Sequence, residues 1–427
     1  MAISLKVVET VVKLAMFGLI SKLVQFLVNL IFGPSSSDKK SNGILCYKVL
    51  YNWKFFALQG GDTSLFTLKF TGVKDLTWLE REDVTLYTVS ENEFVFVRSR
   101  PGVDIHDTEQ HPFLYIIKHD SAVEVGRVAR DVVVDYLRGS GKLDRDGSNV
   151  AILHNIGRCG STLLTSMVSK TKQCHVLSEP LPLMNVVDIL TAKEQAITRH
   201  AVEYYDLVKE TFILLTPDVN RKYFIKTHSQ IIYLLPLLHQ VLPGMRESYM
   251  HRAMRPTITS MLRAFSGMGP FWLLEKLFVH QFPKNIKKLW QENRVKQCAH
   301  CSIILTLANF YIYLNETRDR SDIKSFSYES LMADKRAFCT KFFQEMGIDE
   351  KYVDLALTAM NKDSQQNSAI SKDKTEDNKV EVTEEALEWG KRVGLQLAIE
   401  MEGHDYRVSN IQHAWDSFPK LEVDAEL

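Results

Sequence analysis

This 427-residue sequence has no excess of either charge, because 52 lysines and arginines balance 52 aspartates and glutamates. That balance argues against a protein that binds nucleic acid along a broad basic surface, so we expect no nucleic-acid partner. Cysteine is also scarce. Six cysteines in a chain of this length are too few for a disulfide scaffold.

The spacing of a zinc site is missing as well. Cys298 and Cys301 form the sequence CAHC, but no second pair follows at the spacing of a zinc ribbon. We therefore expect no metal site. The chain is also too long for one ordinary domain, so two or three structural units are expected.

Charged residues are rare near the N-terminus, where residues 14–32 contain only Lys22. A helix that spans a bilayer needs roughly 20 apolar residues, so residues 1–32 fit an uncleaved single-pass anchor in the Golgi or another internal membrane. Lys22, Gln25 and Asn29 share one helical face. That pattern fits equally a helix lying on a membrane surface, or one packed on a soluble cytoplasmic domain. All three interpretations stay open.

A linker and a small accessory unit follow this segment. Residues 33–43, GPSSSDKKSNG, have the composition of a linker, and residues 44–145 are expected to form a small α+β unit. Within it, apolar and polar residues alternate over 84–99 around a polar turn, which predicts a β-hairpin. Residues 111–119 predict another strand. Apolar residues at helical spacing predict a helix over 121–137.

The pattern changes in the last unit, residues 146–427. Short apolar segments alternate there with helical patterns, which predicts βαβ units and a parallel sheet covered by helices on both faces. We therefore predict a three-layer α/β/α domain, in which ligands bind at the carboxyl ends of the strands. The predicted strands are VAILHN (150–155), HVLSEP (175–180), YFIKTH (223–228), SYMHR (248–252) and IKSFSY (323–328).

A glycine-rich turn, GRCGST at 157–162, follows the first of these strands. Consecutive backbone N–H groups at the start of a helix bind anionic oxygens; Arg158 adds a cation, while Ser161 and Thr162 add hydroxyl donors. An ordinary strand-to-helix turn with a Ser/Thr cap is the alternative. The turn lacks the glycine spacing and the lysine of a Walker A loop, which disfavours Mg²⁺-dependent ATP hydrolysis.

Basic and hydroxyl side chains follow two further strands. Lys226 and His228 are two residues apart, so an extended chain points both to the same face. A histidine can accept a proton from a hydroxyl nucleophile, and a lysine can neutralise a transferring group. Arg252, Arg255 and Ser260 are candidates for clamping a second phosphate. Taken singly, each motif fits an ordinary strand end or a solvated basic helix start equally well.

In this order, the segments resemble the sulfotransferases that use 3′-phosphoadenosine 5′-phosphosulfate (PAPS). GRCGSTLL resembles their 5′-phosphosulfate loop, and RAMRPTITS is similar to their R-x-P-x-x-x-x-x-S segment at the 3′-phosphate. KTHSQ resembles their K-T-H element, and FSYESL resembles the Y-E-D-L segment whose tyrosine lies near the adenine. The resemblance covers roughly residues 150–375, leaves residues 1–145 outside, and implies a P-loop NTPase-like fold.

The resemblance implies a reaction and a set of site residues. A sulfonate group would pass from PAPS, as co-substrate, to a hydroxyl or amine of an acceptor, without a metal. His228 would act as the base, while Lys226 and Arg158 would stabilise the transferring group. Glu179, after the second strand, is a rival or auxiliary base. The nucleotide would bind at Arg158, Cys159, Gly160, Ser161, Thr162, Arg252, Ser260 and Tyr328.

Several positions depart from the family pattern. Arg158 replaces the loop lysine that is common in cytosolic members, Cys159 replaces a serine, and Met254 replaces a proline. The C-terminal R-K-G-x-x-G segment is not recognisable. Lys372 or Lys374, in a polar segment expected to form a loop, is the candidate that would take over its role.

Two other functions stay open on the sequence alone. One is a nucleotide kinase or NTPase with a degenerate phosphate loop, and the other is a non-catalytic nucleotide-binding module. The acceptor is open too, because acceptor pockets are built from variable loops. A carbohydrate, sterol, phenol, amine or other small molecule would fit equally.

Overall fold

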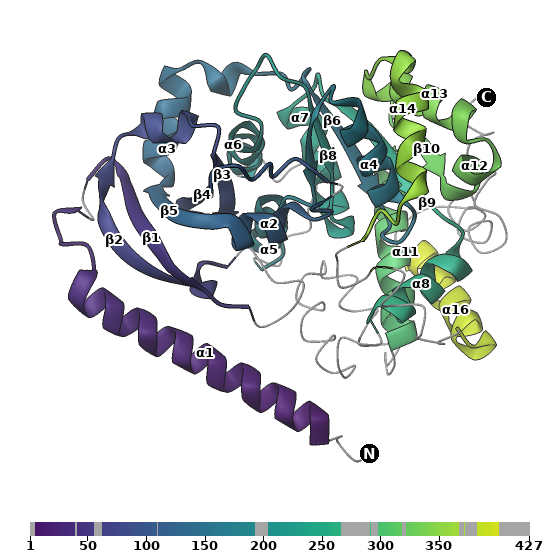
Figure 1. Cartoon of the computed structure of the whole chain (residues 1–427). Coiled ribbons are helices and arrows are strands. Elements are labelled where there is room, and N and C mark those ends of the chain that lie inside the picture. The colour runs from purple at the N-terminus through teal and green to yellow at the C-terminus, as the bar shows by residue number, and fades with distance from the viewer. Residues whose placement is uncertain are drawn as a thin grey trace.

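A computed structural model describes residues 5–38, 41–54, 62–108, 110–192, 204–265, 291, 298–317, 322–366, 371 and 382–400. Two five-stranded sheets dominate the described part of the chain. Figure 1 shows them next to each other, with the antiparallel sheet built from the N-terminal part and the parallel sheet from later residues.

The antiparallel sheet has the strand order β2-β1-β5-β4-β3. The hairpin predicted over 84–99 is confirmed, with Val84 opposite Arg98 and Val89 opposite Phe94. Neighbouring side chains on β4 point to opposite faces, so Phe94 joins the main core and Val95 joins a smaller cluster on the other face. The strands are β1 (Ile44–Asn52), β2 (Phe66–Lys74), β3 (Val84–Val89), β4 (Glu93–Ser99) and β5 (Ala122–Ala129).

Two predictions for this unit are wrong. The strand expected over 111–119 is replaced by helix α2 (Leu114–Ser121). Most side chains of α2 are buried, including Lys118 and His119, and the apolar run at its start resembles a buried strand. The first half of the helix expected over 121–137 is strand β5, followed by helix α3 (Arg130–Gly139). β5 pairs with both β1 and β4, and this central position in the sheet outweighs the helical spacing.

The parallel sheet contains all of the strands predicted after residue 146, in the order β10-β9-β6-β8-β7. β6 is central and buried along its whole length. Its Leu153 lies opposite Lys226 on β8 and Ser248 on β9, so neighbouring carboxyl ends lie at one edge. The strands are β6 (Val150–Asn155), β7 (His175–Ser178), β8 (Tyr223–Lys226), β9 (Arg246–His251) and β10 (Lys324–Ser327).

Helices cover both faces of the parallel sheet. The connection from β6 to β7 through α4 and the connection from β8 to β9 through η6 and α7 run in opposite directions across the sheet. Right-handed crossovers therefore place α4 and α7 on opposite faces. The predicted mixed α/β architecture with a parallel sheet is confirmed, and the antiparallel sheet is joined to it. The elements on or beside the parallel sheet are α4 (Ser161–Thr171), α5 (Leu181–Ala192), α6 (Tyr205–Leu215), η6 (Ser229–Leu234), α7 (Leu235–Val241), α8 (Met254–Phe265), α11 (Cys298–Thr317), α12 (Tyr328–Ala333), α13 (Lys335–Met346), α14 (Val353–Leu357) and α16 (Glu384–Glu400).

The two sheets share one hydrophobic core, which runs from Ile44 on β1 to Val393 on α16. Polar contacts also join them. The Arg130 guanidinium donates to the buried Glu210 carboxylate at 2.7 Å, and burial opposes this carboxylate's charge, raising its pKa above the ordinary value. Ser178, at the end of β7, donates to the carbonyl of Pro112 at 2.6 Å. The accessory sheet is therefore attached next to the carboxyl edge of the parallel sheet.

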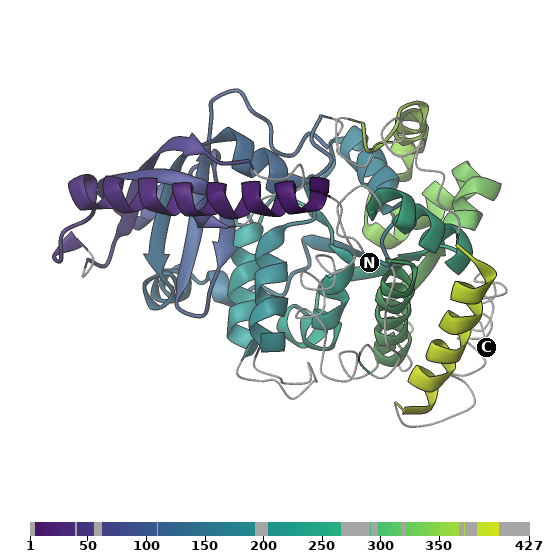
Figure 2. The ribbon, with the colours of Figure 1, turned by 90° about the horizontal axis from the view of Figure 1, so that it is seen from below.

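Helix α1 (Leu5–Phe32) lies along the antiparallel sheet and contacts its edge strand β2. Figure 1 and Figure 2 show it as a rod on the outside of the molecule. Across the described residues, no helix has both the length and the apolar character that crossing a membrane requires.

Candidate functional site

The side chains that the sequence analysis selected follow the strands of the parallel sheet, at its carboxyl edge. The glycine-rich loop follows β6, Glu179 follows β7, His228 follows β8, and Arg252 follows β9. Because parallel strands end at one edge, segments far apart in the sequence meet there. Residues brought to this edge are Arg158, Cys159, Gly160, Ser161, Thr162, Glu179, Lys226, His228, Arg252, Ser260 and Tyr328.

The backbone of the loop has an unusual conformation. Gly157, Arg158 and Gly160 have positive φ angles of 75°, 54° and 90°. A non-glycine residue in this region costs roughly 1–2 kcal/mol, so Arg158 is held there against its local preference. Gly160 precedes α4, and no side chain caps that helix. The start of α4 therefore lacks a cap from its N-cap residue, and N–H groups at such a helix start are able to bind an anion.

Arg158 links the loop to two distant segments. Its Nε donates to Ser260 Oγ of α8 at 2.9 Å, and its Nη1 donates to Gln365 Oε1 at 2.7 Å. Burial lowers the pKa of the Arg158 guanidinium, and the nearby positive charge of Arg252 lowers it further. Two guanidinium groups gathered in one partly buried place are stabilised by an anion between them.

Arg252 is the second cation of the site. Its Nη1 donates to the Arg158 carbonyl at 3.5 Å, and its guanidinium lies 4.5 Å from the centre of the Tyr328 ring. Its Nε is buried and has no hydrogen-bond partner among the described residues. Arg252 also lines a groove along α8. The other lining residues of that groove are Arg255, Pro256, Thr259, Ser260 and Arg263.

Tyr328 closes over the glycine-rich loop. A Cβ atom added to Gly160 would lie only 2.6 Å from Cδ2 of this ring. Position 160 therefore requires glycine for two reasons, which are its positive φ and the close approach of an aromatic side chain. The ring contacts the loop on one side and the Arg252 guanidinium on another.

Lys226, Glu179 and His228 form a charged group at the ends of β7 and β8. Lys226 is 3% exposed and its ammonium group pairs with the Glu179 carboxylate. Burial lowers the pKa of His228, and Lys226 acts in the same direction while Glu179 opposes it. The Nδ1 atom of His228 has no hydrogen-bond partner among the described residues. This imidazole is thus kept neutral, as a proton acceptor must be.

Sequence reasoning missed two residues that position the loop. The side chain of Asn155, the last residue of β6, accepts from Gly157 N at 2.9 Å and donates to the Thr227 carbonyl at 2.7 Å. It therefore fixes the loop relative to the residue before His228. A buried amide at the end of an apolar strand was the available signal. Gln365, the acceptor from Arg158, lies in a polar segment that gave no such signal.

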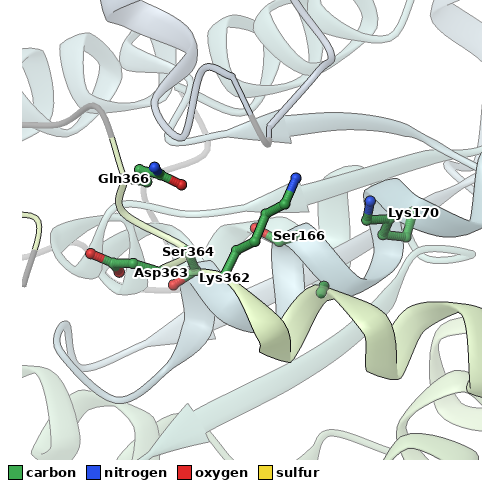
Figure 3. Close-up of a pocket in the computed structure, with 7 residues that line it drawn as sticks. Ser166, Lys170, Lys362, Asp363, Ser364 and Gln366 are labelled. Carbon is green, nitrogen blue, oxygen red and sulfur yellow. The ribbon is translucent and has the colours of Figure 1, made fainter.

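The segment that supplies Gln365 also lines a small pocket against α4, bounded by Ser166, Lys170, Ala359, Lys362, Asp363, Ser364 and Gln366. Figure 3 shows the amino groups of Lys170 and Lys362 on one side of this pocket and the Asp363 carboxylate pointing away from them. Lys372 and Lys374, the candidates for the missing C-terminal segment, lie outside the described residues.

The side chain of Cys159 does not reach the ligand side of the site. Its side chain is fully buried, and burial raises the pKa of the thiol. Only its backbone is therefore positioned to contact a ligand in the loop. Within the described ranges, no group of three or more His, Cys, Asp or Glu side chains is placed to hold a metal ion.

No protein-family model and no curated protein sequence matches this chain. Several solved structures are similar to it at a distance. A sulfotransferase from Alicyclobacillus acidocaldarius shares 13% identity with a TM-score of 0.35, covering 63% of this chain and 98% of the other. The sulfotransferase domain of the curacin biosynthetic pathway shares 11% identity with a TM-score of 0.34, covering 59% and 98%. Retinol dehydratase in complex with retinol and PAP shares 12% identity with a TM-score of 0.29, covering 63% and 88%. At these scores the likeness carries no argument about function.

Proposed function

We propose that this protein transfers a sulfonate group from PAPS to a hydroxyl or amine of an acceptor. The observation that carries the proposal is the contact between Arg158 of the glycine-rich loop and Ser260 of α8, with Arg252 beside both. This contact joins an anion-binding helix start to a groove lined by arginine. A nucleotide with phosphates on both its 5′ and 3′ positions fits such a pair of neighbouring anion sites.

Each end of the nucleotide has its own residues in this proposal. The backbone of Gly160, Ser161 and Thr162 binds the 5′-phosphosulfate at the start of α4. Arg252 and Ser260 bind the 3′-phosphate. For this, Ser260 exchanges its contact with Arg158 for a phosphate oxygen, and the unpaired Nε of Arg252 gains an acceptor.

The chemistry is an in-line displacement at sulfur. The acceptor oxygen or nitrogen forms a bond to sulfur while the bond from sulfur to the bridging oxygen breaks. The leaving group is 3′-phosphoadenosine 5′-phosphate (PAP), and His228 takes the acceptor proton. Negative charge grows on the bridging oxygen, where Arg158 and Lys226 stabilise it.

The pairing of Lys226 with Glu179 refines the role of the carboxylate. From the sequence alone, Glu179 is a rival candidate for the base. In the structure, its carboxylate is bound to the Lys226 ammonium group. We therefore assign it a positioning role, in which it holds Lys226 at the end of β8. His228, whose Nδ1 is unpaired, remains the base.

Calorimetry on the full chain tests the proposal. PAP, ATP and GTP are titrated with and without Mg²⁺, and the proposal expects micromolar affinity for PAP alone, independent of Mg²⁺. Transfer of labelled sulfonate from PAPS to a panel of alcohols, phenols, sugars and amines then tests turnover. Mg²⁺-dependent binding of ATP or GTP would favour a kinase or NTPase instead. PAP binding without transfer to any acceptor would favour a non-catalytic nucleotide-binding module.

A further inference from the structure

Helix α1 presents its apolar side chains outward. Of the large apolar residues that are exposed in the described part of the chain, most lie on this helix, and Leu19 and Leu30 are 70% and 74% exposed. They recur at the i, i+3, i+4, i+7 spacing of one helical face. The face consists of Met16, Leu19, Ile20, Leu23, Phe26, Leu27, Leu30 and Ile31, and we call it the outer face of α1.

The opposite side of α1 attaches to the protein through polar contacts. The Gln25 side chain accepts from Leu68 N at 2.6 Å and donates to the Leu68 carbonyl at 3.0 Å. Ser21, one turn earlier, is 4% exposed. Gln25 thus occupies backbone groups of β2, an edge strand of the antiparallel sheet. Val24 and Val28, on the same side of the helix, are half-buried, so α1 is apolar on both sides while only its outer face stays exposed. An ordinary surface helix instead exposes a polar face.

Positive charge lies on α1 and on the strands next to it. Lys22 is exposed on α1 itself, and Lys69 Nζ lies 4.3 Å from the centre of the Phe32 ring at the end of α1. Lys69 lies directly opposite Lys48 across β1 and β2, and neither strand contains an acidic residue. Like charges placed opposite each other are destabilising unless an anion compensates them. Glu124, the neighbour of Lys48 on β5, is already bonded to other cations.

We propose that the outer face of α1 lies in the surface of a bilayer that contains anionic lipid. Such a bilayer supplies acyl chains for the exposed leucines and anionic headgroups for Lys22, Lys48 and Lys69. A second copy of the chain fits less well, because a symmetric contact through this surface would bring two lysine-bearing faces together. The proposal is independent of the proposed sulfonate transfer, since it uses none of the site residues.

Co-sedimentation of the full chain with vesicles tests it. One set of vesicles contains phosphatidylcholine only, and the other adds about 30% phosphatidylserine. The wild type is expected to bind both and to bind the anionic vesicles more tightly. The triple variant Leu19→Ser/Leu23→Ser/Phe26→Ser is expected to lose at least about 100-fold in partitioning, because three apolar side chains leave the lipid. The matched control is Val219→Ser/Met332→Ser/Leu355→Ser, which changes exposed apolar residues elsewhere and is expected to bind as the wild type does.

Three outcomes would overturn the proposal. One is a wild type that stays in the supernatant with both vesicles. A second is a wild-type dimer in light scattering that the triple variant dissociates, without vesicle binding, which would assign the outer face to self-association. A third is unchanged binding of Lys48→Glu/Lys69→Glu to anionic vesicles, which would remove anionic lipid as the ligand. Equal melting temperatures and equal circular dichroism spectra of wild type and triple variant show that the variant is folded.

Discussion

Two buried lysines show how the accessory unit and the parallel-sheet unit differ. Lys118 of α2 is 2% exposed and donates to the carbonyl of Leu86 at 2.8 Å. Lys226 of β8 is 3% exposed and pairs with the Glu179 carboxylate, close to His228. The first fastens a helix to its sheet through a backbone group. The second brings a charge pair to an edge where other charged side chains converge.

The surrounding polar groups differ in the same way. In the accessory unit, the hydroxyl of Ser121 donates to the Ile117 carbonyl and is hydrogen-bonded to the Ser99 hydroxyl, and Tyr87 is hydrogen-bonded to His119. At the parallel-sheet edge, Arg252 Nε and His228 Nδ1 are buried without a partner among the described residues. Satisfied polar networks stabilise a fold, whereas unsatisfied donors and acceptors at one edge favour a ligand there.

The largest expected effect is on catalysis. His228→Ala removes the proposed base and is expected to lower turnover by about 10²–10⁴ while leaving PAP affinity unchanged. The measurement is the rate of sulfonate transfer from PAPS to an acceptor found with the wild type. His111→Ala, in the accessory unit, is the control and is expected to keep the wild-type rate. If His228→Ala kept most of the turnover, His228 would not be the base, and another group would have to accept the proton.

A pH profile sharpens the same assignment. Burial lowers the pKa of His228, so its neutral form persists below the ordinary imidazole value of 6.5. The base must be neutral to accept a proton, so kcat is expected to stay level down through pH 6.5 and to fall on the acid side of it, about tenfold per pH unit. An acid limb centred above that value would mean that His228 is not the titrating base.

Two glycines with positive φ separate backbone strain from ligand contact. Gly160→Ala adds a Cβ 2.6 Å from the Tyr328 ring, whereas Gly141→Ala adds one to open space. Both replacements cost roughly 1–2 kcal/mol in backbone strain. Only Gly160→Ala is expected to weaken PAP binding, by at least about tenfold, because Tyr328 must move from the loop. Equal PAP affinities of the two variants in calorimetry would contradict this placement of the nucleotide.

The smallest expected effect on activity comes from the accessory lysine. Burial lowers the pKa of Lys118 to about 7. Because its unfolded-state pKa is higher, this lysine destabilises the fold below pH 7, and the penalty fades as the pH rises from 7 toward about 10. Lys118→Met removes this penalty but leaves the Leu86 carbonyl without its donor, so it is expected to add on the order of 2 kcal/mol of stability at pH 7 and less at pH 9. PAP affinity should not change.

Thermal melting of Lys118→Met and wild type at the two pH values checks this prediction, with Lys226→Met as the comparison. Lys226→Met leaves the carboxylate of Glu179 without its cation, so it is expected to lower both transfer rate and stability. If Lys118→Met lowered the transfer rate while Lys226→Met did not, the contrast between the two units would be wrong.

The sequence predicted local patterns better than contacts. The strands of the parallel sheet were found because short apolar runs were bounded by polar motifs, and the loop after β6 because glycine and hydroxyl residues are concentrated there. Residues 111–137 were misassigned because the apolar residues of helix α2 and strand β5 fit both the two-residue repeat of a strand and the 3.6-residue repeat of a helix. Asn155 and Gln365 were missed because their partners lie 72 and 207 residues away.

The central claim is that one pocket binds both phosphates of the nucleotide. The most direct test removes the 3′-phosphate from the ligand and, separately, the Arg252 side chain that would bind it. Calorimetry compares PAP with adenosine 5′-phosphate on wild type, Arg252→Gln and Arg336→Gln. Arg336 of α13 is the matched control, because it is exposed, is paired with Asp354 and does not line the groove. Losing a charge-assisted contact at Arg252 is expected to weaken PAP by about 30- to 100-fold. Binding of adenosine 5′-phosphate should change by less than about twofold, since no contact to it is lost. Equal weakening of both nucleotides by Arg252→Gln, or none, would contradict a single pocket that binds both phosphates.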